Sequence, residues 1–151
     1  MKISQILTAK GATTRTVRHD QNFGKAVAKM HEAQIGSIVV VHADTGALLG
    51  LVSQPEILAG LSTFGASSMT HCITGMMRKP APVCDMEDDI RSVMTRMTID
   101  RCRHAVVTAS DHSILGVVSI GDLVAAQLQE SRLEANVLRD MARSHLMAPS
   151  A

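Results

Sequence analysis

The sequence predicts a mixed α/β fold in which one β-α-β-β-α unit occurs twice, with the two copies packed about a pseudo-twofold axis. The first observation is a repeated phrase, because LGLVSQPEIL at Leu49–Leu58 returns as LGVVSIGDLV at Leu115–Val124, 66 residues later. The second is that FGKAVAKM at Phe23–Met30 matches IRSVMTRM at Ile90–Met97 with an offset of 67. A unit this small buries too little surface to be stable alone, so each copy is expected to cover the apolar face of the other.

The first copy begins with apolar and β-branched segments in a regular order. Asn22 is a good helix cap, and the apolar residues after it recur with the spacing of one buried helical face. Continuous β-branched runs are typical of strands buried on both faces, and Pro55 suits the first turn of a helix. The expected elements are a helix at Ile3–Leu7, strands at Thr14–Val17, Ser37–Val41 and Leu48–Val52, and helices beginning at Asn22 and near Pro55.

The second copy follows a small, polar stretch at Gly65–Thr70, which is the expected joint. Asp88 or Asp89 can cap a helix with an apolar inward face. We therefore assign residues 1–66 to the first repeat and 67–126 to the second. The expected elements are a short helix at Ile73–Met77, a strand entered at Pro82–Val83, a helix after Asp89, strands at Ala105–Thr108 and Ile114–Val118, and a helix from about Gly121.

Residues 127–151 have no counterpart in the first copy and are assigned to a C-terminal helical extension. Ala125–Met147 is rich in strong helix formers. Its apolar residues do not keep one heptad phase, and Ser131 can cap a fresh helix. We expect one long or bent helix with an apolar stripe that packs on a partner subunit or on its own module rather than forming a free coiled coil.

Composition excludes several classes of function. The net charge is only +1, and two Phe are the only aromatic residues among Phe, Trp and Tyr, which argues against nucleic-acid binding. No apolar run reaches the ~20 residues needed to span a membrane, and Met1–Leu7 lacks the apolar region of a signal peptide. Three cysteines without CxxC spacing indicate reduced thiols. We expect a cytoplasmic protein with no membrane or nucleic-acid partner.

The strongest chemical signal is Ser119 followed by Asp122 at a helix start. An Asp carboxylate can accept hydrogen bonds from both hydroxyls of a ribose, and a Ser hydroxyl beside helix N–H groups can hold a phosphate. The same spacing is also a helix-capping signal, which is the alternative reading. No catalytic motif and no zinc-ligand spacing occurs, so we predict neither an enzyme nor a metal site.

The duplicated unit, which closes on GVVSIGD at Gly116–Asp122, resembles a tandem pair of CBS domains, or Bateman module, of the stand-alone bacterial type with a C-terminal helix. The resemblance implies an adenosine-containing ligand in the clefts between the repeats. It also implies flat, disc-like homodimers and the regulation of an associated enzyme or transporter. Because fold and function are separable, these implications remain expectations.

Carried over residue by residue, Ser119 and Asp122 match the Ser/Thr-x-x-Asp ligand motif of that family. The resemblance implies that Arg103 and His104 face a phosphate, for which Arg offers a planar, charged fork. A surface pair of Arg103 with Asp100 is the alternative.

The resemblance also implies that Ala81–Val83, with Met77 before it, holds the adenine ring against apolar walls. Core packing is the alternative role for such a Met. The expected ligand-binding set is Met77, Ala81, Val83, Arg103, His104, Ala105, Ser119, Ile120, Gly121 and Asp122.

The first copy departs from the motif. Glu56 replaces the aspartate, and Gly36–Ser37 replaces the Arg-His pair. We expect this cleft to bind nucleotide weakly or not at all, with Ser53 and Glu56 keeping only a helix-capping role. Thr14–Thr16, the first-copy equivalent of Ala81–Val83, leaves open a different ligand.

The sequence thus predicts a regulatory module that senses an adenine nucleotide and acts through a separate partner protein. AMP is the favoured ligand, and ADP, ATP and NAD-type dinucleotides are further candidates. The alternative is a ligand-free scaffold, in which the repeats and the C-terminal helix serve only oligomerisation.

Overall fold

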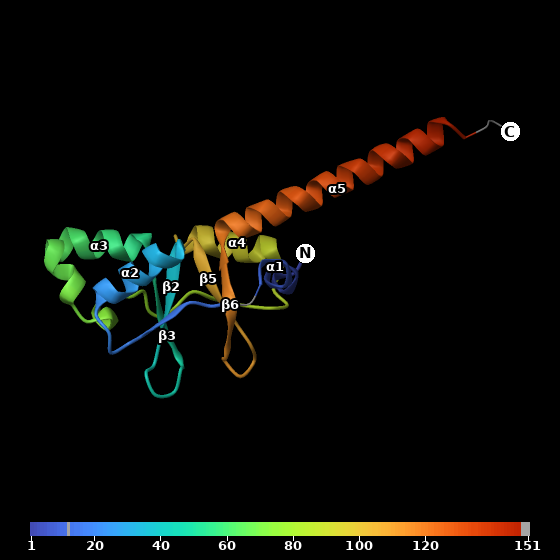
Figure 1. Cartoon of the computed structure of the whole chain (residues 1–151). Coiled ribbons are helices and arrows are strands. Elements are labelled where there is room, and N and C mark those ends of the chain that lie inside the picture. The colour runs from blue at the N-terminus through green and yellow to red at the C-terminus, as the bar shows by residue number, and fades with distance from the viewer. Residues whose placement is uncertain (12, 149–151) are drawn as a thin grey trace.

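The computed structural model describes residues 1–11 and 13–148 and contains two three-stranded sheets with helices packed against them (Figure 1). This architecture confirms the predicted mixed fold of two repeats. In chain order the elements, of which η1 and η2 are 3-10 helices, are α1 (Ile3–Lys10), β1 (Thr16–Arg18), α2 (Phe23–Ala33), β2 (Ser37–Val41), β3 (Leu48–Ser53), α3 (Gln54–Phe64), η1 (Gly65–Thr70), η2 (Ile73–Gly75), β4 (Val83–Asp85), α4 (Ile90–Ile99), β5 (His104–Thr108), β6 (Ile114–Ser119) and α5 (Ile120–Leu146).

The two sheets share one construction. In each sheet the middle strand runs parallel to the first strand and antiparallel to the third. The antiparallel register is interrupted just after Val40 in one sheet and just after Val107 in the other, at positions 67 residues apart. The repeat seen in the sequence is therefore a repeat of the backbone, including its irregularities.

Helices α2 and α4, at equivalent places in the two repeats, each begin at a predicted cap. The Asn22 side chain accepts a 2.9 Å hydrogen bond from a backbone N–H in the first turn of α2. Asp89 does the same for α4 with the N–H groups of Arg91 and Ser92. Such bonds satisfy N–H groups that have no partner inside the helix. Asp88, the other candidate cap, pairs with Arg96 instead.

The core has one cluster in each repeat and a third cluster between the sheets. Phe23 is fully buried in the first repeat and Leu123 in the second. The cluster between the sheets joins Val39 and Leu51 of the first repeat to Ala81 and Val106 of the second. This shared apolar layer holds the repeats together, as expected for units too small to fold alone.

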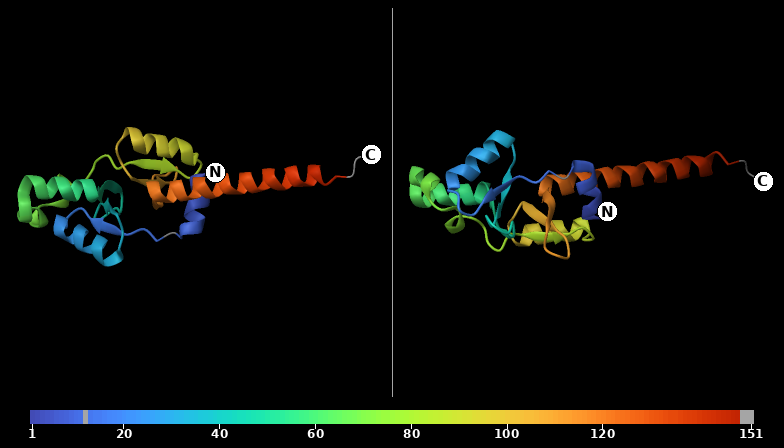
Figure 2. Two further views of the ribbon diagram at one scale, coloured as in Figure 1. Left: turned by 90° about the horizontal axis from the view of Figure 1, so that it is seen from above. Right: turned by 60° about the horizontal axis from the view of Figure 1, so that its bottom comes forward.

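Helix α1 packs on the second repeat, although it precedes the first. Ile3, Ile6 and Leu7 are buried in the core of the second repeat. The backbone N–H of Ile3 donates to Asp88 O at 3.0 Å, and Figure 2 shows α1 beside the start of α5. The chain therefore crosses from the second repeat to the first in the segment after Lys10.

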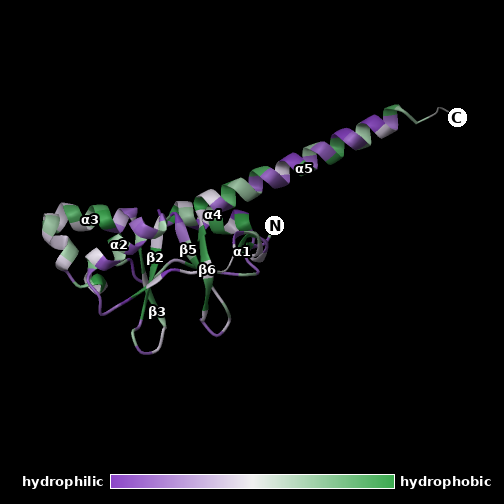
Figure 3. Ribbon diagram, in the orientation of Figure 1, coloured by the Kyte–Doolittle hydropathy of each residue, from purple (hydrophilic) through white to green (hydrophobic). Residues whose placement is uncertain are grey.

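Helix α5 runs from Ile120 to Leu146 as one continuous helix and projects far beyond the sheets (Figure 1). Ser131 does not interrupt it. Hydrophilic and hydrophobic residues alternate along the projecting part (Figure 3). Within the described part of the chain, no helix combines the length and apolar content that crossing a membrane requires.

Candidate ligand-binding site

The junction between β6 and α5 places Ser119 and Asp122 in a reciprocal helix cap. The Asp122 N–H donates to Ser119 Oγ at 3.1 Å, and the Ser119 N–H donates to Asp122 Oδ2 at 2.8 Å. The capping role is therefore present. Among the described residues, no hydrogen-bond donor reaches Asp122 Oδ1, so this oxygen can still accept a hydrogen bond from a ligand.

Lys10, the last residue of α1, is the second partner of this carboxylate. Its ammonium donates to Asp122 Oδ2 at 2.8 Å and to Val117 O at 3.2 Å. Burial disfavours the charged form of Asp122, but the hydrogen bonds from Lys10 and Ser119 outweigh it and hold the pKa of Asp122 below its ordinary value. The carboxylate is thus ionised at neutral pH. Sequence reasoning missed Lys10, because it lies 112 residues away along the chain.

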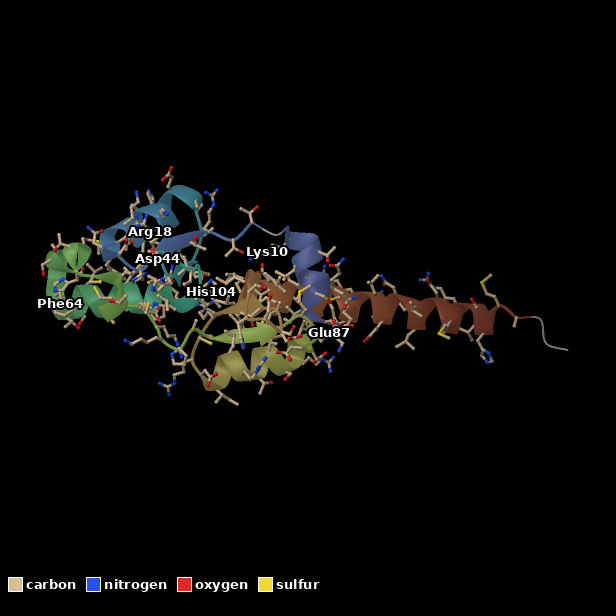
Figure 4. The ribbon with its side chains drawn as sticks, turned by 90° about the horizontal axis from the view of Figure 1, so that it is seen from below. Lys10, Arg18, Asp44, Phe64, Glu87 and His104 are labelled. Atoms are coloured by element: carbon tan, nitrogen blue, oxygen red, sulfur yellow. The ribbon has the colours of Figure 1, made fainter. Side chains whose placement is uncertain are left out.

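A cavity of about 310 Å³ opens beside Ser119, at the lower end of the range for small-molecule sites. Its charged lining residues are basic, so an anionic group is favoured there. Figure 4 shows two of the lining residues, Lys10 and His104, at the junction of the repeats. The cavity is lined by Lys10, Gly11, Thr13, Thr14, Arg15, Gln34, Ile35, Gly36, Ser37, His104, Gly116, Val117 and Ser119.

His104 lines both neighbouring cavities, as do Gly36 and Ser119. These are the Ser119 cavity and a second cavity of about 320 Å³ between the starts of α3 and α5. A Cβ added at Gly36 would lie 3.2 Å from His104 Nε2, so the glycine allows the ring to sit close. Burial, with the positive charge of Lys10, lowers the pKa of His104 and favours the neutral ring at pH 7.

The matching region of the first repeat is already occupied by the protein itself. The Arg78 N–H donates to Leu51 O at 2.8 Å, and the Leu51 N–H donates to Arg78 O at 3.0 Å. Met77 lies against Gly50, where an added Cβ would be 2.5 Å from its sulfur. By the repeat offset Gly11 corresponds to Arg78, and its N–H donates to α1 instead. In the second repeat the counterpart of Leu51 is Val117, whose carbonyl accepts from the Lys10 side chain and, among the described residues, from no backbone N–H of the segment that follows α1.

At the start of α3, in the first repeat, Glu56 takes up the hydrogen-bonding groups of Ser53. Its Oε2 accepts hydrogen bonds from the N–H of Ser53 at 3.0 Å and from the hydroxyl of Ser53 at 2.5 Å. Both polar groups of Ser53 are thus used within the helix start. This geometry agrees with the expectation that Ser53 and Glu56 serve as a cap.

The structure distributes most of the predicted set over three cavities. Ser119 and His104 line the open cavity, and Asp122 is bonded to two of its lining residues. Arg103, His104, Ser119, Ile120 and Gly121 line the neighbouring cavity between the helix starts.

The residues expected to hold adenine lie elsewhere. Ala81, Val83 and Ala105 line a third cavity of about 510 Å³ beside α4. Met77 packs on Gly50 of the first repeat.

The physical reason for this separation is the crossing of the chain between repeats. Each helix start faces the segment that leads into the first strand of the other repeat. Ser119 therefore faces Thr13–Arg15, whereas Ala81 packs against Leu51 of the first repeat. The repeat in the sequence shows that Thr14–Thr16 and Ala81–Val83 are equivalent. It carries no signal that each of these segments lies beside the helix start of the other repeat. The roles of all these residues toward a ligand remain predictions.

Comparisons with known proteins agree with this architecture. The CBS domain family model matches residues 12–63 and 73–129. The chain is 29% identical over 139 residues to the CBS domain-containing protein CBSX3, mitochondrial, of Arabidopsis thaliana, covering 87% of this chain and 67% of that protein. A CBS-domain containing protein of Agrobacterium tumefaciens superposes with a TM-score of 0.79 at 30% identity, covering 83% of this chain and 92% of the other.

More distant structures with the same fold carry ligands. A CBS domain protein from Pyrobaculum aerophilum complexed with AMP has a TM-score of 0.72 at 17% identity, covering 81% of this chain and 89% of that chain. The CBS domain pair of protein MJ0100, in complex with 5'-methylthioadenosine and S-adenosyl-L-methionine, has a TM-score of 0.75 at 15% identity. The match covers 86% of this chain and 98% of that chain. At these identities the likeness shows the fold alone.

Proposed function

The chain belongs to the CBS-domain family, and from this premise we propose that it is a regulatory module that binds an adenosine-containing ligand in the cavity beside Ser119. The observation that carries the proposal is the open cavity lined by Ser119 and Lys10, the two residues that bond the partly exposed carboxylate of Asp122. The adenosine compounds bound by two distant relatives of the same fold support the ligand class. AMP is the ligand we favour.

The groups around the cavity suit each part of such a ligand. Asp122 Oδ1 can accept from a ribose hydroxyl, because the described hydrogen bonds to this carboxylate end on Oδ2. The positive end of α5 and the Ser119 hydroxyl favour a phosphate. Thr13–Arg15 and Ile35 supply backbone polar groups and an apolar wall for a base.

Only one of the two pseudo-equivalent clefts is proposed to bind. In the first repeat the backbone of Arg78 is hydrogen-bonded to the backbone of Leu51, and the Glu56 carboxylate accepts from the N–H and the hydroxyl of Ser53. A nucleotide there would have to break two backbone hydrogen bonds before it could form its own. The chain should therefore bind one ligand.

Regulation requires that the ligand prefer one state of the protein over another. Lys10 offers a means, since it links Asp122 to α1 and α1 packs on the core that holds the start of α5. A ligand that engages Asp122 changes the surroundings of Lys10. We propose that this change is passed to a separate partner protein and that the module acts as a homodimer.

The proposal is tested by calorimetric titration with AMP, ATP, NADH and S-adenosylmethionine. Asp122→Ala should weaken binding at least tenfold, because a hydrogen bond to a charged group contributes about 1.5–3 kcal/mol. Glu56→Ala is the matched control at the closed cleft and should bind like the wild type. Equal affinity in Asp122→Ala contradicts the site, and binding of none of the four compounds contradicts the ligand class.

A further inference from the structure

The outer part of α5 has no packing partner within the described chain. Every residue from Ser131 to Leu146 is exposed, over a length of about 24 Å. A helix in a protein gains most of its stability from packing an apolar face on another element. The exposed apolar residues on it include Leu138 at 67% and Leu146 at 84%. A covering surface is therefore needed.

One seam of apolar and small residues, with Ser131 as its one polar member, runs along α5 from Val124 to Leu146. At 3.6 residues per turn its members lie within about 80° of one another, the narrow stripe of a two-stranded coiled coil. The seam starts clear of the sheets, since Val124 is already 40% exposed and Leu128 56%. Its members follow at intervals of four, three, four, three, four and four residues, namely Val124, Leu128, Ser131, Ala135, Leu138, Ala142 and Leu146.

A second group of exposed apolar residues, Leu133, Val137 and Met141, lies on the far side of the helix. It does not form a continuous seam, because Glu130 occupies the heptad position before Leu133 and Asp140 the one after Val137. Charged residues at core positions disfavour a helix pair. The seam through Leu138 is therefore the better contact surface.

The charges beside the Leu138 seam specify the partner and its direction. Arg132 and Arg139 flank one side of the seam, and Glu134 flanks the other. When two such helices run parallel, Glu134 of each copy faces Arg139 of the other copy. In an antiparallel pair, like charges would meet instead. We propose that α5 forms a parallel two-stranded coiled coil with α5 of a second copy of this chain.

The apolar surface of α3 supports this arrangement. Leu58 is the repeat counterpart of Val124, with an offset of 66, and is 71% exposed. A parallel pair places the two modules at the same end of the coiled coil, where the α3 helices can also be covered. The proposal concerns assembly and does not depend on nucleotide binding.

Cysteine crosslinking of the full-length protein tests both the surface and the direction. In a Cys72→Ser background, Leu128→Cys and Leu138→Cys are each oxidised and examined on a non-reducing gel. Both variants should give a disulfide-linked dimer, because only a parallel pair places residue 128 beside residue 128 of the other copy and also residue 138 beside residue 138. Leu133→Cys, on the far side, should stay monomeric on the gel. Crosslinking through Leu133→Cys, or at only one of the two seam positions, overturns the proposal.

Charge exchange gives an independent readout in the monomer–dimer equilibrium measured by sedimentation. Glu134→Arg and Arg139→Glu should each weaken dimerisation roughly fivefold, since two attractive contacts become repulsive. The double variant should restore the affinity of the wild type. The parallel pairing is overturned if the single variants dimerise as tightly as the wild type, or if the double variant still dimerises weakly. This holds even where a dimer persists through another surface.

Discussion

Closure of the first-repeat cleft can be tested by adding one methyl group at Gly50. A Cβ there would lie 2.5 Å from Met77 Sδ and 2.8 Å from the backbone oxygen of Arg78. The sulfur can rotate away, but the carbonyl is fixed by the hydrogen bonds between Leu51 and Arg78. Gly50→Ala should therefore lower the free energy of unfolding by about 1–3 kcal/mol, the usual cost of overpacking.

Gly116→Ala is the matched control in the second repeat. Its Cβ would lie 2.7 Å from Leu7 Cδ2, the end of a flexible side chain that can change rotamer. No backbone atom of a neighbouring segment stands in the way within the described structure. The expected loss of stability is therefore below about 1 kcal/mol.

Urea unfolding followed by circular dichroism measures both variants against the wild type. For a chain of this size each kcal/mol corresponds to roughly 2–4 °C in melting temperature, so thermal melts give a second estimate. Gly50→Ala should be clearly the less stable of the two. Equal losses, or a larger loss in Gly116→Ala, would refute the difference between the clefts.

Three further predictions concern single side chains. Lys10→Met removes a hydrogen bond that lowers the pKa of Asp122, so an NMR titration should show this pKa rise toward 3.8. Ionised Asp122 makes its full contribution to folding stability above pH 3.8, and the wild type loses this contribution as the pH falls through the lowered pKa. Because its pKa is higher, the Lys10→Met variant should lose the contribution at a higher pH than the wild type. Exposed Cys72, whose pKa is lowered by Thr74, should react with a thiol reagent well before buried Cys84, whose pKa is raised to about 12. Phe23→Ala should cost about 3–5 kcal/mol in urea unfolding.

The fold could be predicted because its signals are local and occur twice. The phrase that ends in Ser119 has a copy ending in Ser53, and the same offset relates the capped helices. Short-range rules of capping and periodicity decide such elements. The reciprocal cap of Ser119 and Asp122 follows from the same local rules, and the structure shows it.

The composition of the cleft could not be predicted, because it depends on how the chain crosses between repeats. Ala81 was expected near Ser119, but the apolar layer between the sheets places it against Leu51. Lys10 reaches Asp122, 112 residues away, because α1 packs on the second repeat and not on the first, which follows it directly in the chain. Neither contact leaves a periodic signal in the sequence.

The central claim is that one cleft, formed by Ser119 and the segment before β1, binds the ligand. Backbone amide NMR during a titration with AMP tests it directly. The amides of Thr14, Gly36 and Ser119 should move together and saturate at one equivalent per chain. Shifts centred on Ser53 and Ala81, or saturation at two equivalents, would contradict the account.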